Sequence, residues 1–327
     1  MARPAQPLPR HGGDLSLATR LYGAPAGGWL DLSTGISPFG YPIPPLTDDA
    51  YRRLPDADGL AALIAAAREA YRVPDDIEVV AVPGSEIAIR LLPAILDADR
   101  ATIVSPTYGS HAAAWRNVAA VASIEAVADG GVAVVVNPNN PDGRIASRDE
   151  LARLAGRVAW LIVDEAFADV APEASLIPAM RGRNAIVLRS LGKFYGLAGL
   201  RLGFVIAPEG VAARLRDRLG DWPVSGVALA AGTAALRDAD WREATRPRLR
   251  EASHAMRRLL AGHGLTIAGG TDLFTLIAAD DAHGLHERLA ERGIWTRAFA
   301  DNPRWLRFGV ADDTGRERLD TALRDLR

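Results

Sequence analysis

A single lysine stands in a glycine-rich turn of this 327-residue chain. The stretch SLGKFYGLAGLRLG (190–203) places Lys193 just after the apolar run AIVLRS (185–190), and Arg201 follows eight residues later. Lysine and arginine together number 38, and every one of them except Lys193 is an arginine. A desolvated amine has a lowered pKa and can attack a carbonyl carbon, whereas a guanidinium stays protonated and cannot form a Schiff base. Lys193 is therefore either a surface lysine in a loop or an amine that holds an aldehyde covalently, and its being the one lysine of the chain favours the second.

Groups that can bind a phosphate lie close to Lys193 in the sequence and after one other apolar run. Ser190 supplies a hydroxyl and Arg201 supplies a guanidinium fork. The segment Gly84–Glu86 follows the run EVVAV (78–82) and opens a predicted helix, whose N-terminal N–H groups favour an anion. Taken alone, Ser85 is more typical of an ordinary helix cap. No GxGxxG motif is present here, so a Rossmann dinucleotide site is not supported.

A carboxylate ends a third apolar run. Asp164 follows WLIV (160–163), and a buried carboxylate is costly unless it has a partner. That partner is either an arginine, in a salt bridge, or a bound cation such as a protonated ring nitrogen. Pyridoxal 5′-phosphate (PLP) carries an aldehyde for Lys193, a phosphate for Arg201 and a ring nitrogen for Asp164. The sequence therefore predicts a PLP site.

The elements that must position these groups alternate along the chain. Short runs rich in valine and isoleucine, separated by amphipathic stretches, end in Pro, Asn, Asp or Ser. Such runs are typical of strands buried on both faces of a parallel sheet, joined by helices. Open sheets of this class bind ligands at the carboxyl ends of their strands. The predicted strands lie at 78–82, 101–106, 132–138, 158–166 and 185–190.

Composition limits the class of protein. The 34.8 kDa chain can form one large domain with a lobe, or two domains. Its formal charge of −2 argues against a nucleic-acid partner, and the absence of cysteine excludes disulfides, thiolate metal sites and cysteine nucleophiles. The N-terminus has no apolar segment typical of a secretory signal, and no apolar run is long enough to span a bilayer. We expect a cytoplasmic protein without a membrane partner.

The motifs together resemble those of fold-type I PLP enzymes in the class I/II aminotransferase family. They occur in the family's order over most of the chain: SPTY (105–108), NPNNPDG (137–143), VDEAF (163–167), SLGKFYGLAGLRLGF (190–204) and WLRFG (305–309). Within the family, HGGDLSLATRLYG (11–23) and LDLSTGISPFGYP (30–42) resemble the N-terminus of threonine-phosphate decarboxylases of cobalamin biosynthesis. Those enzymes are close to histidinol-phosphate aminotransferases.

The resemblance implies a role for each motif residue. For the cofactor, Lys193 forms the Schiff base, Asp164 pairs with the ring nitrogen, Tyr108 stacks on the ring and Asn140 donates to the ring O3′. The cofactor phosphate is held by Gly84, Ser85, Glu86 (through its backbone N–H), Ser190 and Arg201. For the substrate, Arg307 binds the carboxylate, Arg297 binds the phosphate, and His11, Gly12, Gly35 and Asn140 complete the site.

The resemblance also implies the architecture. It predicts an α/β fold with a mostly parallel sheet in a large PLP domain (43–222) and a smaller α+β domain formed by residues 1–42 with 223–327. The active site is expected between the domains of a homodimer. The chain departs from the family pattern at four positions. It has Phe167 and Leu54 where relatives have tyrosine, Gly192 where they have a hydroxyl residue, and Gly35 where they have asparagine.

Three alternatives stay open from the sequence. A histidinol-phosphate aminotransferase would use the same lysine, aspartate and arginines to act on a different phosphorylated amine. A PLP-binding regulatory domain would not be an enzyme, but its site would be expected to have lost residues such as Lys193. A metal hydrolase is suggested only by His283 and His286, which otherwise are interpreted as exposed helix residues. His111, His254 and His263 carry no motif.

Overall fold

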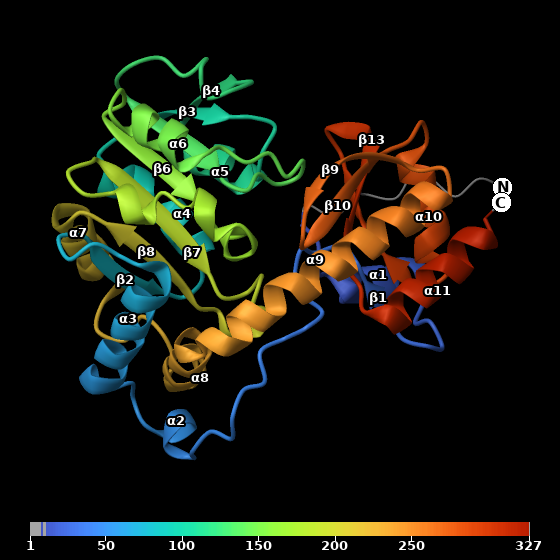
Figure 1. The fold of residues 1–327 in the computed structure, drawn as a ribbon, viewed down its shortest axis with the longest axis horizontal. Coiled ribbons are helices and arrows are strands. Elements are labelled where there is room, and N and C mark those ends of the chain that lie inside the picture. Colours follow the sequence, from blue (N-terminus) through green and yellow to red (C-terminus); the bar gives the residue numbers. More distant parts are fainter. Residues whose placement is uncertain (1–7, 9–10, 327) are drawn as a thin grey trace. The chain divides into compact units, whose positions relative to one another are not determined.

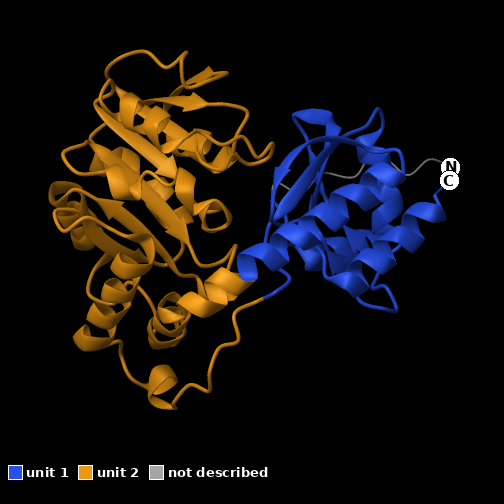
Figure 2. Cartoon of the chain, viewed as in Figure 1, with its two compact units in different colours: residues 1–39, 245–327 blue, residues 40–244 orange. Residues whose placement is uncertain are grey.

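The chain folds into two compact units. The computed structural model describes residue 8 and residues 11–326. Residues 40–244 form the larger unit, and the described N-terminal residues up to 39 join residues 245 onward in the smaller one (Figure 2). Residues 40–42 and 223–244, which were predicted to belong to the small domain, therefore lie in the larger unit. Their helix α8 (Gly226–Arg237) packs on α3 (Ala57–Tyr71), where a Cβ on Gly232 would lie 3.0 Å from the Leu63 side chain.

The larger unit is built on a seven-stranded sheet with the order β2-β8-β7-β6-β5-β3-β4 (Figure 1). Strand β8 is antiparallel to both of its neighbours, and the other pairs are parallel. The predicted mostly parallel sheet is confirmed, although β4 and β8 were not predicted. The strands are β2 (Glu78–Val82), β3 (Arg100–Val104), β4 (Asn117–Val121), β5 (Val132–Val136), β6 (Trp160–Asp164), β7 (Ala185–Ser190) and β8 (Gly203–Ala207).

The strand directions bring the polar strand ends to one edge. Strands β2 and β7 point the same way because both are antiparallel to β8. The carboxyl ends of β2, β3, β5, β6 and β7 therefore meet at the edge where β8 begins. Asp164 and Ser190 are the last residues of β6 and β7, and Gly84 follows β2 by two residues. This edge is where open α/β sheets bind ligands.

Helices cover the sheet, and this explains why its strands are apolar on both faces. All five residues of β5 and of β8 are buried. One face packs on α4 and α7 through a shared cluster that includes Ile89, Leu92, Leu215, Ile162 and Leu188. The helices not yet described are α2 (Asp49–Arg52), α4 (Ser85–Ile95), α5 (Gly109–Ala114), α6 (Arg148–Ala155), α7 (Glu209–Leu219) and α9 (Ala239–Gly262), and short 3₁₀ turns cover 168–170, 172–174, 177–179 and 198–200.

A buried ion cluster lies directly behind the strand ends. The Arg189 guanidinium donates to Glu165 Oε2 at 3.1 Å and to Asp169 Oδ1. Its central carbon lies 4.3 Å from the centroid of the Tyr71 ring. Burial raises the pKa of the Glu165 carboxyl and of the Tyr71 phenol. Arg189 directly precedes Ser190, and Glu165 directly follows Asp164. Because Arg189 binds Glu165, the cluster joins the ends of β6 and β7 and fixes the polar edge of the sheet.

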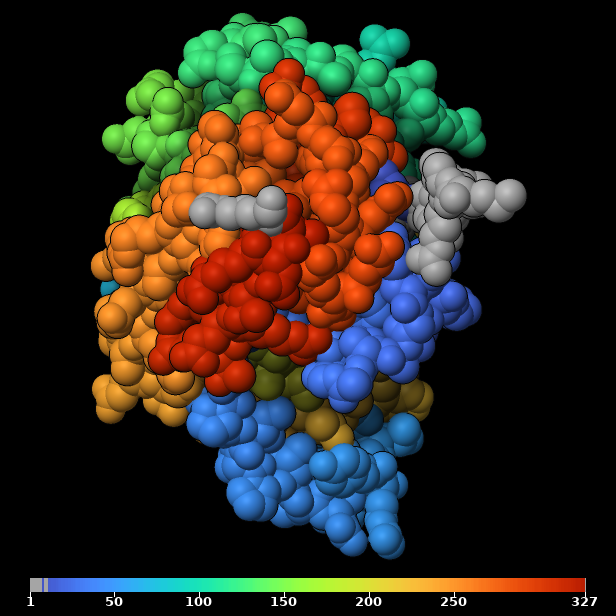
Figure 3. All heavy atoms as spheres, turned by 90° about the vertical axis from the view of Figure 1, so that its right-hand side faces the viewer, coloured from blue at the N-terminus to red at the C-terminus, as the bar shows by residue number. Residues whose placement is uncertain are grey.

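The smaller unit has an antiparallel sheet of order β12-β13-β10-β9 and a short parallel pair, β1 with β11. Figure 3 views this unit from the side of its C-terminal helix α11, drawn in red. Its elements are α1 (Leu15–Tyr22), β1 (Leu30–Asp31), β9 (Thr266–Thr271), β10 (Phe274–Ala278), α10 (Ala282–Ala290), β11 (Ile294–Trp295), β12 (Arg297–Phe299), β13 (Asn302–Gly309) and α11 (Asp313–Arg324). Within the described part of the chain, none of the helices has the length and apolarity needed to cross a membrane.

Candidate active site

The groups predicted to hold a phosphate converge at the start of β8. Ser190 pairs with Gly203, the first residue of that strand. A Cβ on Gly203 would lie 2.8 Å from the backbone nitrogen of Ser85, and a Cβ on Gly84 would lie 2.6 Å from Arg201 Nη2. The helix amide, the end of β7 and the guanidinium therefore surround one small space. Any side chain at Gly84 would collide with the guanidinium that the space needs.

The start of α4 favours an anion in this space. Gly84 caps the helix with φ 82°, a conformation that glycine adopts without strain. The first N–H groups of a helix have no carbonyl partner within it, and the helix dipole adds positive potential there. The Glu86 carboxylate accepts hydrogen bonds from Arg90 Nε and from the Tyr108 hydroxyl, each at 3.1 Å. Its negative charge is thereby partly offset, and the residue can offer its backbone N–H to a ligand.

The buried carboxylate at the end of β6 has a histidine as its partner. Asp164 Oδ2 lies 2.9 Å from His111 Nε2, and both residues are at most 3% exposed. Asp164 Oδ1 accepts a hydrogen bond from the backbone N–H of Ala166 at 3.0 Å. The sequence left an arginine or a ligand cation as the partner of Asp164, and His111, which carries no motif, was interpreted as an ordinary surface or packing residue. That interpretation of His111 was wrong, since the imidazole orients the carboxylate.

Tyr108 connects the carboxylate with the anion site. It directly precedes α5, the helix that carries His111, and the two rings meet nearly edge to face with centroids 6.2 Å apart. Its hydroxyl donates to Glu86, at the start of α4. Burial is the main cause that raises the pKa of the Tyr108 phenol, which therefore stays a hydrogen-bond donor. The predicted ring-stacking residue is thus fixed at both ends.

Lys193 lies half-buried in the turn after β7. Its amine is 5.7 Å from the centroid of the Phe167 ring, and Phe167 follows Asp164 by three residues. The backbone N–H of Gly192 donates to Ser190 Oγ at 3.2 Å. A Cβ on Gly192 would lie 3.1 Å from the Ala198 α-carbon, which is closer than ordinary contact. A side chain at position 192 would therefore require Ala198 to shift.

Asn140 lies in the turn that follows β5. The backbone N–H of Asn137 donates to the Asp164 carbonyl at 2.8 Å, so this turn begins beside the carboxylate. The Asn139 side chain holds the turn by accepting from the Thr107 hydroxyl at 2.6 Å and donating to Asp142 Oδ1 at 2.8 Å. Asn140 itself is half-buried. The structure thus brings the predicted amide to the same sheet edge as Asp164 and Lys193.

The donor set at this edge fits PLP. An amine can hold an aldehyde, a fixed carboxylate can pair with a ring nitrogen, and the helix amides with Ser190 and Arg201 can bind a phosphate. The two glycines at 84 and 203 keep the phosphate space open, because a Cβ on either one would occupy it or collide with its walls. Every cofactor residue predicted from the sequence lies in the larger unit.

Two arginines face each other in the smaller unit. Arg297 on β12 is the direct antiparallel partner of Arg307 on β13. Directly opposed residues have their Cβ atoms about 5 Å apart on the same face of the sheet, and like charges there repel. Each guanidinium lies over an aromatic ring, Arg297 over Phe299 at 5.1 Å and Arg307 over Phe274 at 5.0 Å. An anionic ligand with two charged groups would relieve the repulsion.

The N-terminal segment of the smaller unit approaches Arg307 through Ser33. Arg307 Nη2 donates to the Ser33 carbonyl at 3.0 Å. A Cβ on Gly12 would lie only 2.2 Å from that same oxygen. His11 is exposed beside Gly12, and Gly35 is buried two residues after Ser33. Of the predicted substrate residues, Gly12 therefore lies beside the carbonyl that Arg307 contacts.

The two helix histidines that suggested a metal site have other partners. His286 is 1% exposed, and its Nδ1 lies 2.8 Å from Thr296 Oγ1, next to Arg297. His283 Nε2 donates to the Phe299 carbonyl at 2.9 Å. The expectation that both are exposed was wrong: His283 is half-buried, and α10 turns His286 into the core against Trp295.

His286 should make the stability of the protein depend on pH. Burial, with smaller contributions from His283 and Arg297, lowers its pKa from 6.5 to about 4. The unfolded chain gains a proton as the pH falls through 6.5, but the folded chain does not until about pH 4. The free energy of unfolding should therefore fall by about 3 kcal/mol across this window. Urea unfolding of His286→Asn should lose this component, whereas the exposed His254→Asn should keep it.

Comparisons with known proteins agree with this arrangement. Residues 46–326 match the model of the aminotransferase class I and II family. The threonine-phosphate decarboxylase of Pseudomonas aeruginosa is 41% identical over 326 residues, which cover 96% of each chain. The threonine-phosphate decarboxylase of Sinorhizobium sp. is 43% identical over 325 residues, covering 96% of this chain and 97% of the relative.

Solved structures share the fold. The L-threonine-O-3-phosphate decarboxylase from Porphyromonas gingivalis superposes with a TM-score of 0.74 at 19% identity, covering 90% of this chain and 98% of the other. The histidinol-phosphate aminotransferase from Sinorhizobium meliloti, in complex with pyridoxal-5′-phosphate, gives a TM-score of 0.77 at 20% identity, with 95% of each chain covered. At these identities the likeness bears on the fold alone.

Proposed function

Because this chain belongs to the class I and II aminotransferase family, we propose that it is a PLP-dependent lyase that decarboxylates L-threonine O-3-phosphate. The product is (R)-1-amino-2-propanol O-2-phosphate. Support comes from the two decarboxylases that resemble the chain over nearly its full length. The observation in the structure that carries the proposal is the direct pairing of Arg297 with Arg307. Two opposed guanidinium groups suit a short substrate that carries a carboxylate and a phosphate.

The residues of the larger unit hold the cofactor. Lys193 holds its aldehyde, Asp164 keeps its ring nitrogen protonated, and His111 fixes the orientation of Asp164. Tyr108 stacks on the ring and Asn140 donates to its O3′ oxygen. The amides of Gly84–Glu86, with Ser190 and Arg201, bind its phosphate. When bound, PLP supplies an electron sink for the electron pair left as the bond from the α-carbon to the carboxylate breaks.

The residues of the smaller unit orient the substrate. Arg307 binds the carboxylate and Arg297 binds the phosphate, while His11, Gly12 and Gly35 complete the site. Holding both ends of a short substrate fixes its rotation and so selects which bond at the α-carbon is broken. With the cofactor bound, the Lys193 amine would be a proton donor to the substrate α-carbon once CO2 has left.

An aminotransferase for histidinol phosphate is the function that this proposal must exclude. The holoenzyme is incubated with histidinol phosphate and 2-oxoglutarate, and glutamate is measured beside a parallel reaction with L-threonine O-3-phosphate. We expect no glutamate from either amine and consumption of threonine phosphate alone. Glutamate from histidinol phosphate would assign the chain to the aminotransferases instead.

The product has a place in a larger synthesis. Aminopropanol phosphate supplies the aminopropanol linker of the cobalamin nucleotide loop, so the chain is proposed to act in cobalamin biosynthesis. The cytoplasm is the proposed location, because phosphorylated metabolites do not cross membranes unaided and both substrate and cofactor are phosphorylated.

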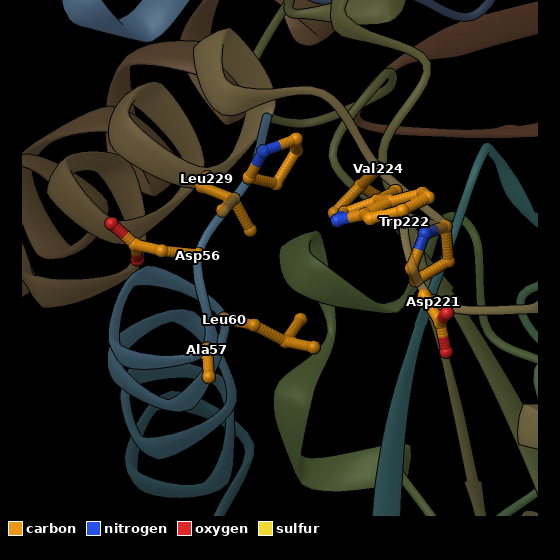
Figure 4. A pocket seen from close by; sticks show the side chains of 9 residues that line it. Asp56, Ala57, Leu60, Asp221, Trp222, Val224 and Leu229 are labelled. Atoms are coloured by element: carbon orange, nitrogen blue, oxygen red, sulfur yellow. The ribbon is translucent and has the colours of Figure 1, made fainter. Parts of the chain in front are cut away.

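The proposed assembly is a homodimer, and an exposed apolar surface of the larger unit supports it. Tyr51, Leu54 and Trp222 are 67%, 68% and 56% exposed. Exposed apolar side chains that gather in one region mark interaction surfaces. A pocket of ≈ 210 Å³ lies beside Trp222 in the larger unit. Figure 4 shows that Trp222 stands opposite Leu60 and Leu229 in this pocket. Pro55, the residue after Leu54, also lines it.

Replacing Trp222 or Leu54 with aspartate should dissociate this dimer. A buried, unpaired carboxylate in an apolar interface is strongly unfavourable. We expect the variants to sediment as monomers at concentrations where the wild-type protein sediments as a dimer. Val118→Asp is the matched control, because Val118 is 40% exposed on β4, elsewhere in the same unit. Identical sedimentation of all four proteins would contradict the assignment of this surface.

A further inference from the structure

Ser33 joins the N-terminal segment to the arginine that is proposed to bind the substrate carboxylate. It is fully buried, and its backbone N–H and its hydroxyl both donate to Asp31 Oδ1, at 2.9 Å and 2.6 Å. Its hydroxyl oxygen accepts from the Gly13 N–H at 2.7 Å. Its carbonyl accepts from Arg307 Nη2 at 3.0 Å. One residue therefore holds the segment on one side and the guanidinium on the other.

The chain around Ser33 is anchored on both sides. The Leu32 N–H donates to the Trp295 carbonyl and the Leu32 carbonyl accepts from the Gly309 N–H, each at 2.7 Å. Gly309 ends β13, the strand that carries Arg307, and a Cβ on it would lie 2.3 Å from the Thr34 carbonyl. The Ser33 carbonyl is therefore a fixed acceptor. Since a guanidinium is planar with donors in a rigid fork, one bond to a fixed acceptor restricts the direction of the other donors.

The backbone of residues 12 and 13 packs against the same Ser33 carbonyl. A Cβ on Gly12 would lie 2.2 Å from Ser33 O and 2.9 Å from Ser33 Oγ, distances that side chains do not adopt. Gly13 has φ +88°, which favours glycine. The two glycines thus let the backbone of residues 12–13 lie directly on Ser33. A larger residue at position 12 must displace either this segment or the carbonyl that aims Arg307.

We propose that Ser33 is a positioning residue for Arg307, and that Gly12 couples the seating of the N-terminal segment to the orientation of this arginine. The inference rests on the proposed function, since it assumes that Arg307 binds the substrate carboxylate. The expected effect of disturbing Ser33 or Gly12 is specific to the substrate carboxylate. Disturbing Ser33 or Gly12 weakens the binding of a ligand that carries the carboxylate and leaves the binding of a ligand without it unchanged.

The substrate and the product provide this comparison, because they differ by the carboxylate. In one assay of the holoenzyme, the KM for L-threonine O-3-phosphate and the competitive Ki for (R)-1-amino-2-propanol O-2-phosphate are measured. Gly12→Ala should raise KM about 10- to 100-fold, which is the worth of one or two hydrogen bonds to a charged group. The Ki should stay within about twofold of the wild-type value. Ser33→Ala keeps the carbonyl and the backbone N–H bond to Asp31 but loses the hydroxyl's bonds to Gly13 and Asp31, so it should shift KM in the same direction by less.

Controls separate this inference from a folding defect and from a wrong function. Gly27→Ala places a Cβ in open space in the same unit and should leave both constants unchanged. Equal increases in KM and Ki for Gly12→Ala and Ser33→Ala, or no change in either, would overturn the coupling. If Gly12→Ala does not fold, Ser33→Ala decides the question alone. A wild-type protein that does not act on threonine phosphate at all would refute the proposed function instead.

Discussion

Lys193→Arg is expected to lower the rate of decarboxylation at least about 10³-fold, because arginine keeps the positive charge but cannot form the Schiff base or exchange a proton near neutral pH. Lys193 is the one lysine of the chain, which allows a direct chemical test. Borohydride reduction of the wild-type holoenzyme should fix one cofactor on the peptide that contains residue 193. The variant should acquire no covalent cofactor, as measured by peptide mass spectrometry.

A matched control introduces a lysine elsewhere. Arg116 is exposed at the start of β4, outside the site, so Arg116→Lys adds a second surface amine. We expect this variant to retain full activity and to carry the reduced cofactor on residue 193 alone. Covalent cofactor on residue 116, or activity that persists in Lys193→Arg, would mean that the lysine is not selected by its surroundings.

Arg297→Ala should lower kcat/KM for L-threonine O-3-phosphate by about 10²- to 10³-fold, because it leaves the substrate phosphate without its charged partner. The same change should have little effect on L-threonine, which has no phosphate, so the preference between the two substrates should collapse. The measurement is the ratio of the two kcat/KM values in wild-type and variant proteins.

Arg307→Ala provides the opposite control for this pair. It should weaken the use of both substrates, since each carries the carboxylate. The two arginines are direct partners in the sheet, so the contrast tests the assignment of each group rather than the presence of positive charge. An Arg297→Ala variant that keeps its preference for threonine phosphate would show that the phosphate binds elsewhere.

The strands, and the position of candidate residues at their ends, could be predicted from the sequence because their signals are local. A run such as VAVVV at 132–136 has the apolarity of a doubly buried strand, and strand ends place Asp164 and Ser190 at one edge of the sheet. Strand β8 was missed although GFVIA is just as apolar, since it begins directly after the lysine motif and its direction depends on pairing with β2 and β7. Local patterns do not encode such pairing.

Contacts between distant segments could not be predicted from the sequence, because local patterns do not encode them. His111 and Asp164 are 53 residues apart, and no motif marks the histidine. The exact opposition of Arg297 and Arg307 depends on the register of β12 on β13, which the intervening turn sets. Helix α8 was placed in the wrong unit because its composition does not reveal that Gly232 packs against α3. The signal that could have found His111 is its position three residues after Tyr108.

The central claim is that this chain removes CO2 from threonine phosphate rather than moving its amine. The most direct test incubates the PLP-loaded protein with carboxyl-labelled L-threonine O-3-phosphate, without any oxo acid, and compares labelled CO2 with substrate consumed. The account predicts one CO2 for each substrate over many turnovers. Substrate consumption that stops after one turnover, without CO2 and with the cofactor converted to pyridoxamine phosphate, would contradict it and identify a transaminase.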